Sequence, residues 1–489
     1  MPTALIVGSG PNGLTAAITL ARAGVDVVVA EAQNSIGGGL RSGELTLPGL
    51  IHDHCAAIVP TAVASPFIKT LNLEQHGVQW AWPDVELAHP LDGGRAAAVF
   101  RSLDTTAQYL DADAGAYRRM FDWLVANYDH FAADLLSPMV AVPRRPLKLA
   151  RFGLPAMLPT TLLVQAFRTP QARALFAGNA AHSWTPLSRP PSAGVALMFG
   201  TIAHRYGWPC VVGGTAQLAE AFARLLRSLG GRIETGTPIR SREQIADFDL
   251  VLFDTSPALV LRLLGDRLPA RTRRAYARYR YGAAAFKLDL AVHGGIPWTN
   301  RFARSAGTVH VCGSYEEIVA AEHDTYHGRM PSRPFMIVGQ QSVADPTRAH
   351  RDLHPIYAYA HVPQGYSADP TESMLDQIER FAPGFRDRIA CVARRGPQDL
   401  YRDNANIVDG DINGGAMDLR QYIGRPRLTP DPYWTGVPGH YLCSSSTPPG
   451  AGVHGMCGHL AALSALQRAR IIAQPRVLGD TCTDGWQGC

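Results

Sequence analysis

A segment near the start of the chain has the residue types and the spacing that bind phosphate groups. Gly8, Gly10 and Gly13 form the pattern Gly-x-Gly-x-x-Gly, and the acidic residue Glu31 follows the next apolar run. In folds that bind dinucleotides, the first glycine makes a tight turn, the second lets the backbone approach the pyrophosphate, and the third lets a helix pack on a sheet. A carboxylate at Glu31 can accept hydrogen bonds from ribose hydroxyls and repels a 2′-phosphate. The segment therefore predicts a dinucleotide other than NADP.

The residues around this loop predict the strand, helix and strand that the motif needs. Residues 4–7 are apolar, residues 14–23 carry apolar side chains three and four positions apart, and residues 25–30 form a second apolar run. The amino terminus of such a helix offers free N–H groups and a partial positive charge to phosphates. We therefore expect a βαβ unit, with Pro11 and Asn12 of the loop beside the cofactor.

A second glycine-rich segment follows within a few residues. Backbone at Gly38 and Gly39 can approach a bound cofactor closely, and the guanidinium of Arg41 can offset the charge of a pyrophosphate. The alternative is a glycine hairpin with an arginine in solvent. Under the first interpretation, the cofactor contacts in this segment are Ala32, Gly38, Gly39, Leu40 and Arg41.

Two later segments again combine glycines with a helix and a strand. Residues 213–239 contain paired glycines, an amphipathic helix and a strand, and residues 439–458 run from a strand through a glycine-rich loop into a helix. Backbone N–H groups of this last loop can stabilise negative charge on a cofactor. The cofactor contacts expected in the loop are Gly450, Gly452, Val453 and His454.

Together, these segments resemble the FAD-binding segments of the amine oxidase and phytoene desaturase flavoprotein superfamily. Further motifs at residues 286–289, 306–310, 345–349 and 410–415 resemble its phytoene desaturase-like branch, which is related to pyridine nucleotide-disulfide oxidoreductase domain-containing protein 2. The resemblance covers essentially the whole chain and implies FAD as cofactor, with the backbone of Ile239 holding the adenine. The chain has neither a redox Cys-x-x-x-x-Cys pair nor a second βαβ glycine motif to seat NAD(P)H. Both observations argue against a reductase driven by a pyridine nucleotide.

The implied fold is α/β, with a Rossmann-type FAD-binding domain (GR2/amine-oxidase-like), an interleaved α+β substrate domain and a helical lid region. A chain of 489 residues is long enough for two or three domains. We expect the FAD-binding domain to be discontinuous, at 1–69, 213–265 and 421–489, and the substrate domain to occupy 70–212 and 266–420. Within the substrate domain, we expect helices over about 104–180 and strands at 284–292, 308–312, 335–341 and 356–362.

Four residues are candidates for catalysis in such a site. His454 can act as a base or a hydrogen-bond donor, or it can stabilise its own loop, and His52 follows the second glycine-rich segment closely enough to line the same pocket. Tyr357 and His361 lie an even number of positions apart on an expected strand, so they face the same side and are pocket candidates. His52 and the nearby His54 have no third ligand, so no metal site is predicted.

Charge and composition exclude several other classes of protein. The formal net charge is +5 and basic residues are mixed with acidic ones, so the charge pattern gives no support to nucleic-acid binding. The eight cysteines lie far apart, so we expect reduced thiols, with Cys443 and Cys457 in the core and Lys287 and Asp289 forming a buried ion pair. The first strand follows Met1 so closely that we expect no secretory signal and a cytoplasmic protein. The basic and then apolar residues 144–167 fit either a peripheral membrane contact or a lid of the substrate domain.

These inferences lead to one expected function. FAD would take a hydride from a C–C or C–N bond of an apolar or amphipathic small molecule, and oxygen or a quinone would reoxidise it. The alternatives are a flavin-dependent double-bond isomerase and a non-catalytic lipid- or protein-binding member of the same fold. The pattern predicts neither the identity of the substrate nor the oligomeric state.

Overall fold

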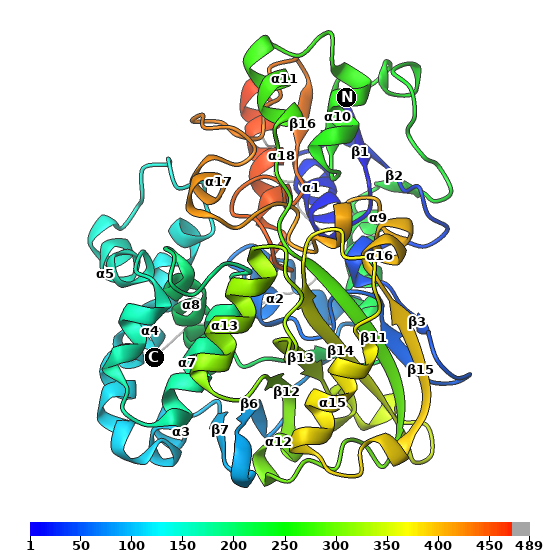
Figure 1. Ribbon diagram of the computed structural model, residues 1–489. Helices are drawn as coiled ribbons and strands as arrows, with labels where there is room; N and C mark the ends of the chain where they lie inside the picture. The colour runs from blue at the N-terminus through cyan, green and yellow to red at the C-terminus, as the bar shows by residue number, and fades with distance from the viewer. Residues whose placement is uncertain (472–489) are drawn as a thin grey trace, which may run out of the picture.

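Two β-sheets form the centre of the protein, which we describe for residues 1–471 of a computed structural model (Figure 1). The first sheet has five strands in the order β16-β10-β1-β2-β9, and every neighbouring pair is parallel. Strands β1, β2 and β10 are mostly apolar and buried because helices cover both faces of the sheet, whereas the edge strand β9 carries the exposed Arg232 and Glu234. The strands are β1 (Thr3–Val7), β2 (Asp26–Ala30), β9 (Arg232–Glu234), β10 (Leu250–Phe253) and β16 (His440–Leu442), and the covering helices include α1 (Pro11–Arg22), α9 (Ala216–Ser228), α10 (Pro257–Leu264) and α18 (Met456–Arg468).

The strands of this sheet come from three distant parts of the chain. The last helix, α18, packs on the first helix, α1, at small residues. An added Cβ at Gly458 would lie 1.8 Å from the backbone oxygen of Asn12, and the hydroxyl of Thr15 donates a hydrogen bond to the backbone oxygen of Gly455 at 2.9 Å. The first and last helices of the described chain are therefore in direct contact.

The second sheet has seven strands in the order β15-β11-β14-β13-β12-β6-β7. Its neighbouring pairs are antiparallel, except that β12 and β6 are parallel. All four strands predicted for the substrate domain are present in it, with shifted ends. One face packs against α12 and α15, and the other packs against a layer of helices. The elements are β6 (Val85–Pro90), β7 (Ala96–Val99), β11 (Ala284–His293), β12 (Ala306–Val311), β13 (Met336–Gly339), β14 (Leu353–Val362), β15 (Ile389–Arg395), α12 (Arg301–Ser305) and α15 (Thr371–Phe381).

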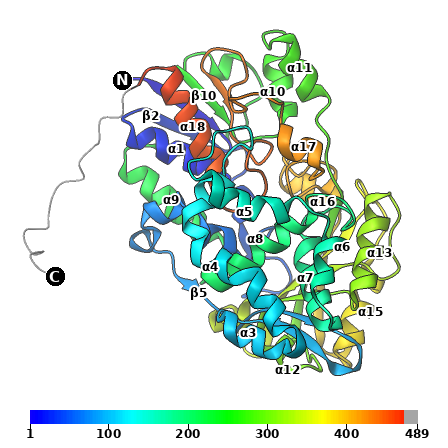
Figure 2. The ribbon, with the colours of Figure 1, turned by 90° about the vertical axis from the view of Figure 1, so that its left-hand side faces the viewer.

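The predicted helical region forms this layer, which faces the viewer in Figure 2. Its longest helix, α4, carries Tyr117, Phe121, Leu124, Tyr128 and Phe131, and all five side chains are buried. Their spacing of three and four positions places them on one face of the helix, which explains why α4 packs into the layer. The layer consists of α3 (Leu103–Tyr109), α4 (Ala114–Leu135), α5 (Pro146–Ala156), α6 (Thr160–Leu163), α7 (Pro170–Ala181) and α8 (Ser192–Arg205).

A sharp bend separates α5 from α6. Pro155 lies inside α5 and Pro159 directly precedes α6, and proline interrupts helices because it lacks a backbone N–H. Within residues 1–471, no single helix has both the length and the apolar character needed to cross a membrane. The segments Pro146–Ala156 and Thr160–Ala166, which meet at 88°, reach that length and composition only when they are taken together.

Three boundaries differ from the sequence-based expectation. Helix α1 begins at Pro11, because proline is favoured at the first helical position, and α18 begins at Met456. Strand β9 ends at Glu234, because Gly236 adopts a φ of +65° and Pro238 follows it. The remaining elements are β3 (Ser42–Glu44), β4 (Ile51–Asp53), β5 (Trp80–Ala81), β8 (Cys210–Val211), α2 (Pro60–Ala64), α11 (Ala270–Ala277), α13 (Tyr315–Tyr326), α14 (Gln341–Ala344), α16 (Pro397–Asp403) and α17 (Leu419–Gly424), together with short 3-10 turns.

Candidate functional site

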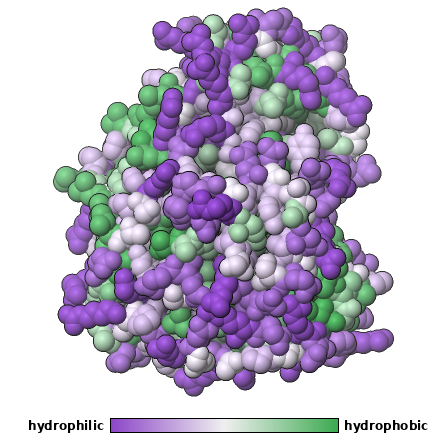
Figure 3. Space-filling model, in the orientation of Figure 1, coloured by the Kyte–Doolittle hydropathy of each residue, from purple (hydrophilic) through white to green (hydrophobic). Residues whose placement is uncertain are grey.

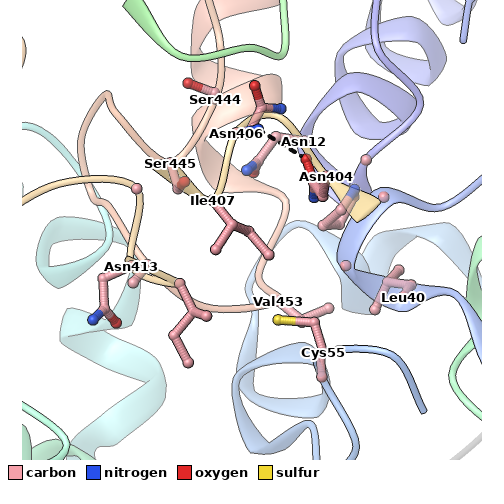
Figure 4. A pocket seen from close by; sticks show the side chains of 18 of the residues that line it. Asn12, Leu40, Cys55, Asn404, Asn406, Ile407, Asn413, Ser444, Ser445 and Val453 are labelled. Atoms are coloured by element: carbon pink, nitrogen blue, oxygen red, sulfur yellow. Dashed lines mark hydrogen bonds between the residues drawn. The ribbon is translucent and has the colours of Figure 1, made fainter. Parts of the chain in front are cut away.

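A cavity of about 640 Å³ opens at the carboxyl ends of β1, β2 and β10, which is where ligands bind in open parallel sheets. Its volume is in the range of small-molecule sites. Figure 4 shows that side chains from distant elements, among them Asn12, Cys55 and Val453, surround a common space. The predicted cofactor contacts that line the cavity are Gly8, Gly10, Pro11, Asn12, Glu31, Ala32, Gly38, Gly39, Leu40, Arg41, Ile239, Gly452 and Val453.

The first glycine loop contains approaches that a side chain would block. Gly8 has a φ of +104°, and a Cβ added at Gly13 would lie 2.2 Å from the carbonyl oxygen of Gly8. A Cβ at Gly10 would lie 2.5 Å from a carboxylate oxygen of Asp254. Gly13 itself does not line the cavity. It brings α1 close to β1, and the amino terminus of α1 thereby points at the cavity.

Asp254, directly after β10, lines the cavity but was not among the predicted residues. Its Oδ2 accepts a hydrogen bond from the backbone N–H of Gly13 at 2.8 Å, and its side chain is buried beneath the glycine loop. Burial raises the pKa of Asp254 to about 7, and the neighbouring carboxylate of Glu31 acts in the same direction. The signal available in the sequence was an acidic residue directly after an apolar strand.

Glu31 holds the glycine loop as well as facing the cavity. Its Oε2 accepts hydrogen bonds from the backbone N–H of Ser9 at 2.9 Å and from the Ser9 hydroxyl at 2.6 Å. Its Oε1 accepts the backbone N–H of Gln33 at 2.8 Å. Hydrogen bonds to a charged acceptor are strong, so these contacts fix the end of β2 against the glycine turn. The contact of Glu31 with a ribose stays a prediction.

Residues 403–414 form another part of the cavity wall. Arg41 donates a hydrogen bond to the backbone oxygen of Asp403 at 2.6 Å, and the side-chain amide of Asn406 donates one to the backbone oxygen of Asp254 at 3.0 Å. The sequence pattern placed this segment in the substrate domain and gave it no cofactor contact. Its signal was a run of amide side chains, and those on the wall are Asn404, Asn406 and Asn413 (Figure 4).

The carboxy-terminal glycine loop contributes Gly452 and Val453 to the cavity wall, but Gly450 and His454 do not line it. The His454 ring accepts a hydrogen bond from the backbone N–H of Met456 at 3.1 Å and lines a second cavity. Burial lowers the pKa of His454 to about 4. Gly450 and His454 therefore lie outside the cavity wall, where the His454 ring holds the first turn of α18, and their contact with a cofactor stays a prediction.

Among the other catalytic candidates, Tyr357 lines the cavity, and its hydroxyl donates a hydrogen bond to the backbone oxygen of Cys55. His361 lies on the same strand but outside the cavity wall. Its Nδ1 is 2.8 Å from a carboxylate oxygen of Glu322, and its ring stacks on Trp184 at 3.6 Å between centroids. Alternation along the strand was sufficient to predict the shared face. Four residues of strand, however, span roughly 13 Å, so the two side chains reach different surroundings.

His52 is buried in a polar cluster between the two sheets and does not reach the cavity. Its Nε2 is 2.7 Å from the hydroxyl of Thr46, its Nδ1 is 3.5 Å from a carboxylate oxygen of Asp289, and burial lowers its pKa to about 4. The predicted ion pair of Lys287 and Asp289 is present in this cluster. Lys287 also donates to the backbone oxygen of Asp53 at 3.0 Å. The cluster therefore joins β4 to β11, and the expectation that His52 lines the pocket is corrected.

The six cysteines in residues 1–471 are all free thiols. Cys443 and Cys457 are buried, and neither forms a disulfide. Cys482 and Cys489 lie outside the described residues. No group of three or more His, Cys, Asp or Glu side chains within residues 1–471 is arranged to hold a metal ion.

One part of the cavity wall is aromatic, and the sequence pattern did not predict it apart from Tyr357. Its side chains come from the helical layer on one side and from β14 on the other. No local pattern could have joined them, because the two groups are far apart in the sequence. The residues are His182, Trp184, Phe199, Trp208, Tyr357 and Tyr359.

A second cavity, of about 990 Å³, adjoins the first. The two cavities share part of their walls, which consists of small and apolar side chains. The rest of the wall of the second cavity is mostly apolar and comes mainly from α5, the loop before α5, and the beginning of α18. The residues that line both are Thr61, Val195, Met198, Met417 and Ala451.

Comparisons with known proteins agree with this architecture. Residues 6–71 match a family model described as an NAD(P)-binding Rossmann-like domain. The chain is 25% identical to pyridine nucleotide-disulfide oxidoreductase domain-containing protein 2 of Rattus norvegicus, over 94% of this chain and 92% of the relative. It is 26% identical to hydroxyneurosporene desaturase of Cereibacter sphaeroides, over 96% and 97% of the two chains. A structure of putrescine oxidase bound to putrescine has the same fold, with a TM-score of 0.59, 18% identity, and coverage of 97% of this chain and 100% of its own.

The residues around the first cavity fit FAD. The glycine loop leaves no space for side chains beside the amino terminus of α1, so backbone can approach a pyrophosphate there. Oδ1 of Asn12 is buried on this wall and has no hydrogen-bond partner within residues 1–471. The predicted fold, a Rossmann-type domain with an interleaved substrate domain, is confirmed. Cavity and comparisons together support an FAD-dependent oxidoreductase, and the chain is similar over nearly its whole length to pyridine nucleotide-disulfide oxidoreductase domain-containing protein 2 and to hydroxyneurosporene desaturase.

Proposed function

We propose that this enzyme oxidises a C–C or C–N single bond of an apolar or amphipathic small molecule to a double bond, by removal of a hydride from a C–H bond and of a proton from the neighbouring atom, and that oxygen or a quinone is the final electron acceptor. The observation that carries this proposal is the composition of one cavity. Dinucleotide-binding loops and aromatic side chains of the substrate domain line the same space. When bound, FAD supplies the hydride acceptor. The protein supplies the position of the substrate and the exclusion of water.

The aromatic part of the wall suits an apolar substrate. Trp184, Phe199 and Trp208 contribute large apolar surfaces from the helical layer. The Asp, Glu and Arg side chains that line the cavity all come from the nucleotide-binding loops, α10 or residues 403–414. None of them comes from the helical layer or from β12, β13 and β14. An uncharged aromatic wall favours apolar groups over ionic ones.

We assign the second cavity as the entrance for such a substrate. Large apolar side chains at and beside its rim are exposed: Val142 to 93%, Leu147 to 86% and Leu154 to 75%. In Figure 3, hydrophobic surface gathers along the left-hand edge, where Figure 1 places α5 and the loop before it. Basic side chains such as Arg144 and Lys148 lie among these residues. Exposed apolar residues with adjacent basic ones are typical of proteins that rest on a membrane surface, which is the peripheral contact we propose.

The first experiment is a spectrum of the purified protein. It should show oxidised flavin, and denaturation should release FAD. Anaerobic titration with a panel of terpenoid alkenes, polyenes, long-chain alcohols and secondary amines should include a compound that bleaches the spectrum. Air or a soluble quinone, added afterwards, should restore it and so identify the acceptor. Trp208→Ala should slow bleaching without loss of FAD, whereas Trp82→Ala, outside both cavities, should not.

The outcomes of this experiment separate the candidate functions. A protein without flavin would refute the proposed function. A flavin that no compound bleaches, together with isomerised double bonds in a recovered alkene, would replace dehydrogenation by isomerisation.

The membrane contact is tested separately by flotation with anionic vesicles. The protein should float with the vesicles, and the double variant Leu147→Glu, Leu154→Glu should not. Val343→Glu places the same charge at an exposed apolar residue on α14, which packs against β12 and β14, and should float like the unmodified chain. Equal flotation of all three proteins would refute the contact.

A further inference from the structure

His182 places a polar ring in the aromatic part of the cavity wall. It follows α7, and its ring centroid lies 4.9 Å from that of Phe199 and 5.8 Å from that of Trp208. Its Nε2 shares a hydrogen bond with Nε2 of His310 at 2.9 Å. Its Nδ1 has no hydrogen-bond partner within residues 1–471 and is not buried. Because His182 lines the cavity, this nitrogen is a hydrogen-bonding atom available to a ligand.

Two fully buried histidines lie behind His182. His310 on β12 and His89 on β6 each have an Nδ1 without a partner among the described residues. A Cβ added at Gly178 on α7 would lie 2.7 Å from Nδ1 of His310 and 3.0 Å from Nδ1 of His89, so both nitrogens point toward the same place. Nε2 of His89 is 2.7 Å from the backbone oxygen of Gly313. That nitrogen therefore carries the hydrogen, and Nδ1 of His89 carries the lone pair.

This lone pair selects the tautomers of the other two rings. Burial lowers the pKa of His89 to about 4 and of His182 to about 3, and it lowers the pKa of His310 well below the ordinary value. All three rings are then neutral at neutral pH, with one N–H each. No hydrogen bond joins Nδ1 of His310 to Nδ1 of His89. Two lone pairs directed at the same space would repel each other, so a hydrogen on Nδ1 of His310 is favoured, and Nε2 of His310 is then the acceptor. His182 then donates from Nε2 and keeps a lone pair on Nδ1, toward the cavity.

The groups around the three rings are compatible with this arrangement. Glu322 on α13 is bonded to His361 at 2.8 Å, and within residues 1–471 neither His182 nor His310 forms an ion pair with a carboxylate. Glu317 acts on His89 only through the electrostatic field, and the capping bonds of α13 hold it in place. The titratable groups from neighbouring elements that act on the three rings are His361 on β14 and Glu317 on α13; Tyr359 and Glu322 contact His361.

We propose that this end of the cavity binds a neutral hydrogen-bond donor, a hydroxyl or an N–H group on an otherwise apolar substrate, and that Nδ1 of His182 is the acceptor. His310 and His89 are positioning residues that hold the tautomer. The proposal rests on the proposed function and deepens it, because it names the polar group that the substrate carries. A ligand without a donor would leave the nitrogen unpaired in an apolar surround, which costs binding energy.

Phenol and anisole test the donor site, because they share a ring and an oxygen but only phenol donates a hydrogen bond. Calorimetric titration of the full chain should show phenol binding about fivefold to tenfold more tightly than anisole, the value of one net hydrogen bond. His182→Phe should abolish this preference. His182→Gln, whose amide oxygen can accept, should retain part of it. His204→Gln is the matched control: His204 is a buried histidine of the same layer, bonded to Tyr117 at 2.8 Å outside both cavities, and its loss should leave the preference unchanged.

Nitrogen-15 NMR of histidine-labelled protein tests the tautomer without a ligand. The His182 signals, assigned by their loss in His182→Phe, should show an unprotonated Nδ1 at neutral pH, and His310→Phe should remove that preference. A protonated Nδ1 in the unmodified chain, equal affinities for the two probes, or no binding of phenol would overturn the proposal. A protein that prefers phenol but carries no flavin would refute the proposed function and leave the donor site standing.

Discussion

Replacement of Gly13 by alanine tests whether the close approach of α1 to β1 positions the cofactor. The added Cβ would lie 2.2 Å from the carbonyl oxygen of Gly8 and 3.0 Å from Oδ2 of Asp254. Real Cβ contacts are essentially never shorter than 3.0 Å, so the start of α1 has to move by about 0.8 Å or more. The hydrogen bond from the Gly13 N–H to Asp254, now 2.8 Å, is strained by the same movement.

Two costs of different kind follow from this movement. Overpacking in a well-packed region costs about 1–3 kcal/mol of folding stability, with or without cofactor. The movement also displaces the N–H groups at the start of α1, and the loss of one hydrogen bond to a charged phosphate costs about 1.5–3 kcal/mol of binding energy. At 1.4 kcal/mol for each factor of ten, FAD should bind about 10-fold to 140-fold more weakly.

Fluorescence titration of the FAD-free protein with FAD measures the binding cost, and thermal unfolding of the FAD-free protein measures the folding cost. Gly153→Ala is the matched control, because Gly153 is also a helical glycine and a Cβ there would meet nothing within 4 Å. It should bind FAD normally and be slightly more stable, since alanine favours helix. An unchanged affinity of Gly13→Ala for FAD would refute the reasoning about the glycine loop.

Two further predictions concern buried charges. The raised pKa of Asp254 means that its contribution to stability is complete below the unfolded value near 3.9 and is lost as the pH rises through about 7. The thermal midpoint of the FAD-free protein should therefore be lower at pH 8 than at pH 4, and this decrease should be smaller in Asp254→Asn. Parallel plots of thermal midpoint against pH for the two proteins would contradict this. Arg348→Met should lower the free energy of unfolding by about 3–5 kcal/mol in urea denaturation, because it leaves the buried carboxylate of Asp53 without the guanidinium 3.0 Å away. Exposed Arg351 provides the control substitution, Arg351→Met, and equal losses in the two variants would exclude the ion pair as the cause.

The nucleotide-binding loops could be predicted because their geometry depends on neighbouring residues. The glycines from Gly8 to Gly13, the apolar runs beside them and Glu31 lie within one βαβ unit, so spacing alone specifies how they meet. Asp254 illustrates the limit of such reasoning. It approaches the same loop from a strand that is distant in sequence, and the pairing of β1 with β10 is visible only in the folded chain.

The substrate-facing wall was harder to predict for a related reason. The period of a strand gave the face on which Tyr357 and His361 lie, but not where along that face the cavity ends. Trp184 and Trp208 lie in irregular segments after α7 and α8, and tertiary packing decides where these segments run. His454 was expected at the cofactor because it follows a glycine loop, yet its ring bonds to the first turn of the next helix instead.

The contact of α1 with α18 has a consequence for the order of assembly in the cell. During translation the glycine turn leaves the ribosome well before β16, Val453 and α18. Until then the edge of β10 has no partner strand and the cofactor pocket lacks one of its walls. We therefore expect flavin to bind only after these segments have folded, and a variant that stops before residue 440 should remain colourless.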